Sequence, residues 1–463
     1  MTYMSTNPFT NEVVATFPDM TDEALRVIVD RAQTTFESWR LTPFAERSHF
    51  IRRAAALLRE NADEYAGLLT LEMGKLFAES LGEVELSASI LEYYADNAEK
   101  FLAPEHLGIA SGEHGDATVV SEPLGILLGV QPWNFPYYQL ARVAGPNLMA
   151  GNVVIVKHAS IVPQAAAAFE RLFRDAGAPD GLYTNVYATK EQVSALVDDH
   201  RIRGVALTGS EQAGSILAAR AGKNLKKSTM ELGGTDALIV LADADIDKTV
   251  TWALWGRMNN GGQCCVASKR IIVVDSVAFE FIEKFTAAMT RLAAGDPFLA
   301  STTLPPMSSQ SAVDGLRSQV KIAADCGAVV TEVGESVPST GAFMQPTIIT
   351  EIDRENPAYD EEFFGPVALI FRARDEEDAI RIANDSSYGL GGSIFTADVE
   401  HGKRLASQID TGMVFVNHPT WTRADLPFGG IKKSGYGHEL SHFGITEFVN
   451  KKLINVVPID APA

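Results

Sequence analysis

Residues 259–266 read NNGGQCCV, a turn that places two of the chain's three cysteines side by side after a glycine pair. Glycine has no Cβ, so the backbone of such a turn can approach a ligand closely. A thiol on this kind of turn is a candidate nucleophile, because a thiolate attacks carbonyl carbons readily. The alternative is a buried pair of cysteines acting as small hydrophobes, which is common for free cysteines.

Three further motifs place polar side chains in apolar or glycine-rich surroundings. Residues 230–234, MELGG, put Glu231 between apolar residues and a glycine pair. Residues 131–136, QPWNFP, set Asn134 between two aromatic residues, and residues 361–366 read EEFFGP. A cysteine, a glutamate and an asparagine amide form a sensible set for acyl transfer, as nucleophile, general base and oxyanion donor.

Length and composition limit the class of protein. A chain of 463 residues is expected to fold as two or three domains. The net charge of −20 argues against nucleic acid or an anionic membrane as a partner. We find no signal-peptide pattern at the N-terminus and no apolar run long enough to span a membrane. Three cysteines do not make a secreted disulfide framework, so a cytoplasmic protein is expected.

Hydrophobic periodicity predicts an α/β protein. Helical spacing dominates to about residue 100, and strand–helix alternation follows from residue 124. This alternation predicts a parallel sheet with helices on both faces, and a second α/β unit is expected from about 270 to 433. The short apolar runs that we expect to be strands are 126–130, 153–156, 183–187, 205–208 and 237–241.

Two segments stand apart from this alternation. Residues 105–123, punctuated by Gly108, Gly112 and Gly115, predict a hairpin that leaves the first domain. Residues 447–457 read as a final strand.

Taken in order, the four motifs resemble the aldehyde dehydrogenase superfamily, and the resemblance continues through PFGG at 427–430 to the C-terminus. It implies a Rossmann-type cofactor-binding domain, an α/β catalytic domain and a small β oligomerisation element that completes a partner's sheet. A homodimer or homotetramer is therefore expected. The implied ranges are 1–104 with 124–231 for the cofactor domain, 232–446 for the catalytic domain, and 105–123 with 447–463 for the oligomerisation element.

The resemblance also assigns the chemistry. The family pattern Gly-Gln-x-Cys selects Cys265 rather than Cys264 as the nucleophile. The expected reaction is NAD(P)-dependent oxidation of an aldehyde to a carboxylate, through a thiohemiacetal and a thioester on Cys265. The Asn134 amide and the Cys265 backbone N–H would hold the oxyanion, and Glu231 would activate the hydrolytic water.

The usual dinucleotide motif G-x-G-x-x-G is absent from the sequence. Residues 208–214 instead end a predicted strand and open a helix, whose free N–H groups can hold a pyrophosphate. Without the resemblance this stretch would read as an ordinary turn. The positions that match the family's cofactor contacts are Trp133, Lys157, Ser160, Gly209, Ser210, Glu362 and Phe364.

Ser160 bears on the choice between NADP and NAD. Strictly NAD-using relatives carry a glutamate at this position, and its charge repels a 2′-phosphate. Serine removes that charge, and Lys157 supplies a cation beside it. We therefore expect NADP to be preferred and NAD to be the lesser cofactor. The alternative is that Ser160 is only the N-cap of the helix that begins near Pro163.

Arg142 bears on the substrate. It lies eight residues, about two helical turns, after Asn134. In the bacterial succinate-semialdehyde dehydrogenases, which this chain resembles most, an arginine here holds the substrate carboxylate. The expected reaction is therefore succinic semialdehyde to succinate, with Phe135 and Phe428 also at the substrate. The alternative is a surface arginine paired with an acid.

One departure weakens this interpretation. Some relatives carry a second arginine where this chain has Asn259, and Arg257 or Arg423 is a candidate replacement. Other readings also stay open: a broader-specificity enzyme for another small aldehyde, a CoA-acylating relative, or a non-catalytic protein. Glu231 argues against the CoA-acylating reading, because those relatives tend to lack this base. Residues 438–442 match H-E-x-x-H, but a third ligand is lacking nearby and no metal is expected.

Overall fold

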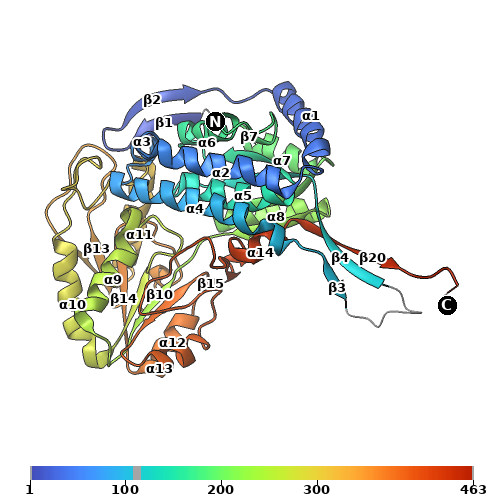
Figure 1. Cartoon of the computed structure of the whole chain (residues 1–463). Coiled ribbons are helices and arrows are strands. Elements are labelled where there is room, and N and C mark those ends of the chain that lie inside the picture. The colour runs from blue at the N-terminus through green and yellow to red at the C-terminus, as the bar shows by residue number, and fades with distance from the viewer. Residues whose placement is uncertain (1–2, 108–115, 461–463) are drawn as a thin grey trace.

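The computed structural model describes residues 3–107 and 116–460 (Figure 1). Two sheets, both mainly parallel, form its body. One has the strand order β19-β9-β8-β5-β6-β7 and the other β12-β13-β14-β11-β10-β16-β17. This arrangement confirms the predicted α/β class. None of the described helices is both long and apolar enough to cross a membrane.

The first sheet is built from strands that are buried on both faces, as parallel strands usually are. Val153 to Val156, for example, are all fully buried. Its strands are β5 (Ile126–Gln131), β6 (Val153–His158), β7 (Tyr183–Asn185), β8 (Ile202–Thr208), β9 (Lys227–Glu231) and β19 (Gly435–Tyr436). The helices of this half of the chain are α1 (Asp22–Trp39), α2 (Phe44–Glu60), α3 (Ala62–Met73), α4 (Phe77–Phe101), α5 (Pro136–Ala150), α6 (Pro163–Asp175), α7 (Lys190–Asp198) and α8 (Glu211–Lys223). A hairpin, β1 (Tyr3–Asn7) with β2 (Glu12–Phe17), precedes them.

The second sheet separates two apolar cores. Successive residues of a strand point to opposite faces, so Ile239 joins one core and Leu238 the other. Its strands are β10 (Ala237–Val240), β11 (Arg270–Val274), β12 (Val329–Glu332), β13 (Thr347–Thr350), β14 (Val367–Ala373), β16 (Gly392–Phe395) and β17 (Phe415–Val416). The accompanying helices are α9 (Ile246–Met258), α10 (Asp275–Thr290), α11 (Gln310–Asp325), α12 (Glu376–Asn384), α13 (Val399–Ala406) and the 3₁₀ turns η1 (Asn259–Gly262) and η2 (Pro357–Tyr359). The short helix α14 (Ser441–Thr446) instead packs against α4 and α5 of the first unit. Two short strands, β15 (Tyr388–Gly389) and β18 (Ile431–Lys432), pair with each other.

A three-stranded antiparallel arm projects from the body of the molecule (Figure 1). It consists of β3 (Glu105–Leu107), β4 (Asp116–Pro123) and β20 (Val449–Val456), which pair in the order β20-β4-β3. Both the hairpin and the final strand expected from the sequence are therefore present. Gly108, Gly112 and Gly115 lie outside the described residues.

The sheets do not follow the expected sequence ranges in full. Gly435 and Tyr436 fall within the range expected for the catalytic domain, but they pair with Glu231 and Met230 at the edge of the first sheet. The division into three ranges stays a prediction.

Candidate active site

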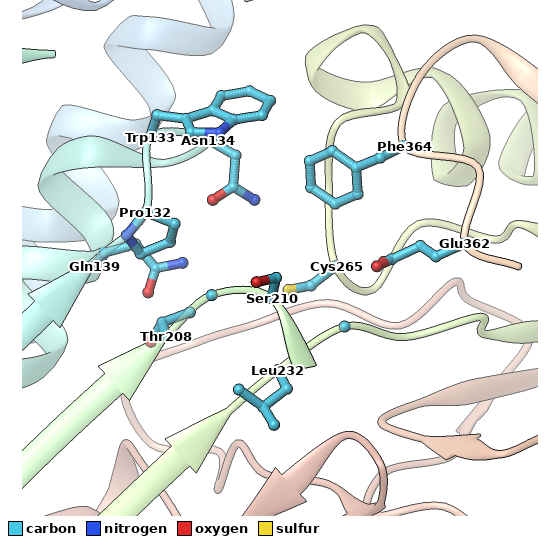
Figure 2. A pocket seen from close by; sticks show the side chains of 12 residues that line it. Pro132, Trp133, Asn134, Gln139, Thr208, Ser210, Leu232, Cys265, Glu362 and Phe364 are labelled. Atoms are coloured by element: carbon cyan, nitrogen blue, oxygen red, sulfur yellow. The ribbon is translucent and has the colours of Figure 1, made fainter. Parts of the chain in front are cut away.

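A cavity of about 200 Å³ lies where the two sheets face each other (Figure 2). The first sheet contributes residues that follow the carboxyl ends of β5, β8 and β9, which is where open α/β sheets bind ligands. The second unit contributes the turn before β11 and the turn before β14. The wall contains Pro132, Trp133, Asn134, Gln139, Thr208, Gly209, Ser210, Leu232, Gly233, Cys265, Glu362 and Phe364.

The turn before β11 has a backbone that only certain residues adopt. Asn260, Gly261 and Gly262 all have positive φ, at 54°, 62° and 78°. Asparagine and glycine are the residues that tolerate this region. A Cβ at Gly262 would also collide with the carbonyl of Gly365. The side chain of Gln263 fixes the turn, because its Nε2 donates to the Asn260 carbonyl at 3.1 Å and its Oε1 accepts from the Ser308 N–H at 2.9 Å.

The two adjacent cysteines differ in their surroundings. Cys264 is buried, whereas Cys265 is partly exposed and lines the cavity, where its sulfur is visible in Figure 2. A hydrogen bond with the Cys264 thiol and burial raise the pKa of Cys265 well above the usual thiol value. The cations Lys269 and Arg142 act in the opposite direction on that pKa.

Asn134 lies beside the cysteine turn and is buried. The side-chain Nδ2 of Asn134 donates to the backbone carbonyl of Gln263 at 3.2 Å. The backbone carbonyl of Asn134 accepts from Asn260 Nδ2 at 2.8 Å. A primary amide has two N–H donors, so one hydrogen remains for a ligand. The geometry suits the donor role expected for Asn134.

Glu231 is the last residue of β9 and is buried. Its Oε1 has no hydrogen-bond partner within the described part of the chain. Burial raises its pKa to about 8, while Arg142 lowers that pKa and Glu439 raises it further. Its neighbours Leu232 and Gly233 line the cavity, whereas Glu231 itself does not. Its role as the base stays a prediction.

The cavity wall offers open backbone at a helix N-terminus and two aromatic rings. A Cβ at Gly209 would meet no atom closer than Leu207, at 3.7 Å, so the backbone there is open to a ligand. Ser210 caps α8 by accepting from the Ala213 N–H at 3.3 Å. The rings of Trp133 and Phe364, both in the cavity wall, meet edge to face with centroids 5.7 Å apart (Figure 2). Exposed backbone at a helix N-terminus and flanking aromatic rings are groups that suit phosphate and a nicotinamide ring.

Lys157 and Ser160 lie at the carboxyl end of β6, outside this cavity wall. Lys157 is partly buried, which lowers its pKa, and its Nζ is 5.5 Å from the centroid of the Tyr3 ring. The suggestion that Ser160 is a helix N-cap was wrong, because the N-cap of α6 is Val162 and no side chain caps that helix. The Ser160 hydroxyl is thus not committed to helix capping.

A second cavity lies on the other side of the nucleophile. It shares Cys265 with the first cavity and is lined by Phe135 and Phe428, whose contact with the substrate stays a prediction. Sequence reasoning did not identify Tyr138, Trp421 and Thr422, which also line it. Trp421 and Thr422 precede the PFGG motif by only a few residues, but their side chains carry no pattern that singles them out.

Arg142 lies behind this second cavity. Its side chain is 0% exposed and forms an ion pair with Glu439. Its Nη1 donates to the Tyr138 hydroxyl at 2.9 Å, and its Nη2 donates to Thr208 Oγ1 at 3.2 Å. The alternative of a surface arginine paired with an acid was wrong about the surface, because Arg142 is buried, but right about the pairing. The guanidinium does not form part of the cavity wall, so direct contact with a substrate carboxylate stays a prediction.

Glu439 belongs to the segment that matches H-E-x-x-H. Helix α14 begins only at Ser441, so His438 precedes the helix and the two histidines do not share a helical face. The glutamate instead turns inward to Arg142. Neither candidate for the second arginine lines either cavity. Arg257 donates to backbone carbonyls such as that of Phe363, and Arg423 is an exposed partner of Asp425.

Sequence reasoning also missed Gln139 and Lys269. Gln139 lies one turn after Asn134 and lines both cavities. Lys269 is fully buried directly before β11, where a lysine among apolar strand residues was the available signal.

Two α/β units thus bring the cysteine turn, the Asn134 amide and Glu362 to one cavity. Residues 1–454 match the model of the aldehyde dehydrogenase family, and the chain therefore belongs to that family. The resemblance inferred from the four motifs is confirmed.

Several relatives match nearly the whole chain. A succinate-semialdehyde dehydrogenase [NADP(+)] of Deinococcus radiodurans is 46% identical over 98% of this chain and 95% of its own length. A probable enzyme of the same name from Synechocystis is 41% identical over 98% of this chain and 99% of its own. The crystal structure of succinic semialdehyde dehydrogenase from Streptococcus pyogenes, in complex with NADP+, matches with a TM-score of 0.96 and 45% identity, over 98% of this chain and 100% of that one.

Proposed function

We propose that this protein oxidises succinic semialdehyde to succinate, with NADP as the preferred cofactor and NAD as a weaker one. The observation that carries the proposal is the buried Arg142 behind an otherwise apolar substrate cavity. The names of the Deinococcus, Synechocystis and Streptococcus relatives support it.

The hydrogen bonds of Arg142 are directed toward the cavity. Arg142 donates to the Tyr138 hydroxyl, and that hydroxyl lies 3.0 Å from Thr422 Oγ1. An arginine only donates, so the Tyr138 proton is free to point to Thr422, and the Thr422 proton is then free for a ligand. Such a chain presents a polarised donor to the cavity, since successive hydrogen bonds strengthen each other. We assign the substrate carboxylate to this donor.

The chemistry follows from the residues around Cys265. Its thiolate forms a C–S bond to the aldehyde carbon, and the resulting oxyanion accepts hydrogen bonds from Asn134 Nδ2 and the Cys265 N–H. Bound NADP supplies the hydride acceptor that turns the thiohemiacetal into a thioester. Glu231 takes a proton from water, which attacks the thioester, breaks the C–S bond and releases the carboxylate and the thiolate.

The preference for NADP rests on Lys157 and Ser160. A 2′-phosphate between an ammonium and a hydroxyl is satisfied by charge and by hydrogen bonding. Ser160 carries no carboxylate, so no negative charge at that position repels the phosphate. Glu362, Phe364 and Trp133 would hold the nicotinamide end, and Gly209 and Ser210 the region between.

We also propose that the chain is a cytoplasmic homodimer or homotetramer that associates through the β20-β4-β3 arm. β20 is an edge strand whose Leu453 and Val456 are 59% and 67% exposed. Exposed apolar edge strands invite pairing with another sheet.

A second candidate function is a broader aldehyde dehydrogenase for neutral aldehydes. The observation that favours it is the wall of the second cavity, which holds no charged side chain among the described residues.

One kinetic comparison tests both. Formation of NADPH or NADH is followed with succinic semialdehyde and with butanal, a neutral aldehyde of equal chain length, each with and without free CoA. The proposal requires a higher kcat/KM for succinic semialdehyde, a higher kcat/KM for NADP, and no dependence on CoA. Equal kcat/KM for both aldehydes would instead establish the broader enzyme.

A further inference from the structure

Lys269 is a buried cation with no role in the chemistry above. It lies four residues after Cys265, directly before β11, and its side chain is 0% exposed. Its Nζ donates to the carbonyl of Cys264 at 2.8 Å and to the carbonyl of Cys265 at 2.7 Å. It also lies 3.0 Å from Glu362 Oε1. An ammonium has three hydrogens, so these three oxygens satisfy it completely.

The contact with the Cys264 carbonyl has a geometric consequence. The carbonyl of Cys264 and the N–H of Cys265 belong to one peptide unit. In a trans peptide these two groups point in opposite directions from a rigid plane. A donor that holds the carbonyl therefore fixes the direction of the N–H, which is the expected backbone donor to the oxyanion.

The contact with Glu362 reaches the cofactor side of the site. The Glu362 Oε1 also accepts from the Gly234 N–H at 3.1 Å, so two donors hold this carboxylate in place. The Lys269 ammonium is 5.5 Å from the centroid of the Phe364 ring, within the range of a cation–π contact. One buried group thus contacts the nucleophile turn and the turn that carries the expected nicotinamide contacts.

We propose that Lys269 is a positioning residue, which orients the Cys265 N–H toward the oxyanion and holds Glu362 for the cofactor. This inference rests on the proposed aldehyde oxidation. Its charge has an additional effect, because Lys269 lowers the pKa of Cys265. A lysine that only filled core volume would affect neither the thiol nor the cofactor.

The test compares Lys269→Met with Arg270→Met. Arg270 is a matched control, since it is the next residue, equally buried, and donates to the carbonyl of Ile382 on the far side of β11. We expect Lys269→Met to lower kcat by roughly tenfold to a hundredfold, less than the loss of a whole oxyanion donor. It should also weaken NADP binding, and iodoacetamide should alkylate Cys265 with a higher apparent pKa. Arg270→Met should change thermal stability only.

Alkylation of the Cys265 peptide is quantified by mass spectrometry, and NADP binding by titration calorimetry. Neither readout needs a substrate, so failure of the proposed oxidation is distinguishable from failure of this inference. If both readouts in Lys269→Met equal those of Arg270→Met, the positioning role is overturned.

Further substitutions keep the test decisive if Lys269→Met fails to fold. Lys269→Arg keeps the charge but replaces the three-donor ammonium with a planar fork. We expect it to keep the thiol pKa near that of the wild type and to lose kcat; wild-type kcat in this variant would overturn the positioning role. Glu362→Gln tests the second contact. The double variant Lys269→Gln with Glu362→Gln should raise the Kd for NADP by less than the product of the two single-variant increases. A rise equal to that product would refute the shared contact.

Discussion

The two cavities that share Cys265 are built on different principles. The cofactor-side cavity presents polar groups in its own wall, including Ser210, Glu362 and the Asn134 amide. The substrate-side cavity is lined mainly by aromatic and apolar residues, and its charge lies behind the wall on Arg142. Cys265 thus borders one cavity whose wall includes a carboxylate and one whose wall has no charged side chain among the described residues.

The difference has a physical reason. A buried guanidinium without a partner would be very costly, so Arg142 is paired with Glu439 and hydrogen-bonded to Tyr138. The hydroxyls of Tyr138 and Thr422 then transmit part of its polarity to the cavity. An apolar wall therefore does not exclude a charged substrate, provided that hydroxyls connect the wall to a buried charge.

Replacing the residue that both cavities share should have the largest effect. Cys265→Ala should abolish aldehyde oxidation, with a loss of more than roughly a thousandfold, because the covalent intermediates cannot form. Cys264→Ser is the control and should retain much of the activity. Replacing the Cys264 thiol should also lower the pKa of Cys265, since that thiol raises the pKa of Cys265. Steady-state NADPH formation measures both, and inactivity of Cys264→Ser alone would overturn the assignment of the nucleophile.

The next effect separates the two chemical steps. Glu231→Gln should slow turnover by about a hundredfold to ten-thousandfold, the usual contribution of a general base. Acylation and hydride transfer do not need this base, so a first turnover should still occur. Stopped-flow mixing should show a burst of NADPH followed by slow turnover. Absence of the burst would move Glu231 to an earlier step.

The substrate-side cavity is tested through its hidden charge. Arg142→Met should raise KM for succinic semialdehyde by roughly tenfold to a hundredfold, the loss of a charge-assisted interaction, and leave KM for butanal nearly unchanged. The single variant leaves Glu439 buried without a partner and should cost about 3–5 kcal/mol of stability.

Arg142→Met combined with Glu439→Gln is the matched control for that instability. The double variant should regain much of the melting temperature but keep the high KM for succinic semialdehyde. Equal effects on both aldehydes would contradict a role for Arg142 in carboxylate recognition.

The preference for NADP is tested at Ser160, which lies outside the wall of the cofactor-side cavity. Ser160→Glu should reduce kcat/KM for NADP by about 1–3 kcal/mol in free energy, because a carboxylate would oppose the 2′-phosphate. NAD lacks this phosphate, so kcat/KM for NAD is the internal control and should change little. A similar loss with both cofactors would show that discrimination lies elsewhere.

The smallest effect is a shift of pH profile. Glu231 acts as a base only when ionised, so deacylation should increase as the pH rises through its pKa of about 8. Glu439 raises this pKa, so Glu439→Gln should move the acid limb to lower pH, by up to about one unit. The kcat profile between pH 6 and 9 measures the shift, with Glu122→Gln on the arm as control. A limb displaced to higher pH would contradict this electrostatic coupling.

The sequence predicted helices and strands well where apolar residues recur at a regular helical or strand spacing. The strand expected at 153–156, for example, is part of β6. The short strand β9, which carries Glu231, was not predicted, because its polar residues Lys227, Ser228 and Thr229 give no apolar run. It is stabilised instead by pairing with β8 and β19, which lie elsewhere in the chain.

The sequence by itself determined the family, the candidate nucleophile and the α/β class. These depend on short motifs and on periodicity, which are written in neighbouring residues. The motif residues Asn134, Cys265 and Phe364 lie around one cavity, as their order along the chain implied.

Only the tertiary structure decided which charged side chains form ion pairs. Arg142 and Glu439 are far apart in sequence and touch because α5 and the segment before α14 pack together. Lys269 meets Glu362 because the turns before β11 and β14 begin adjacent parallel strands. Pairing of buried charges depends on which segments the cores bring together and not on local spacing, so residue patterns left the partners of both cations undetermined.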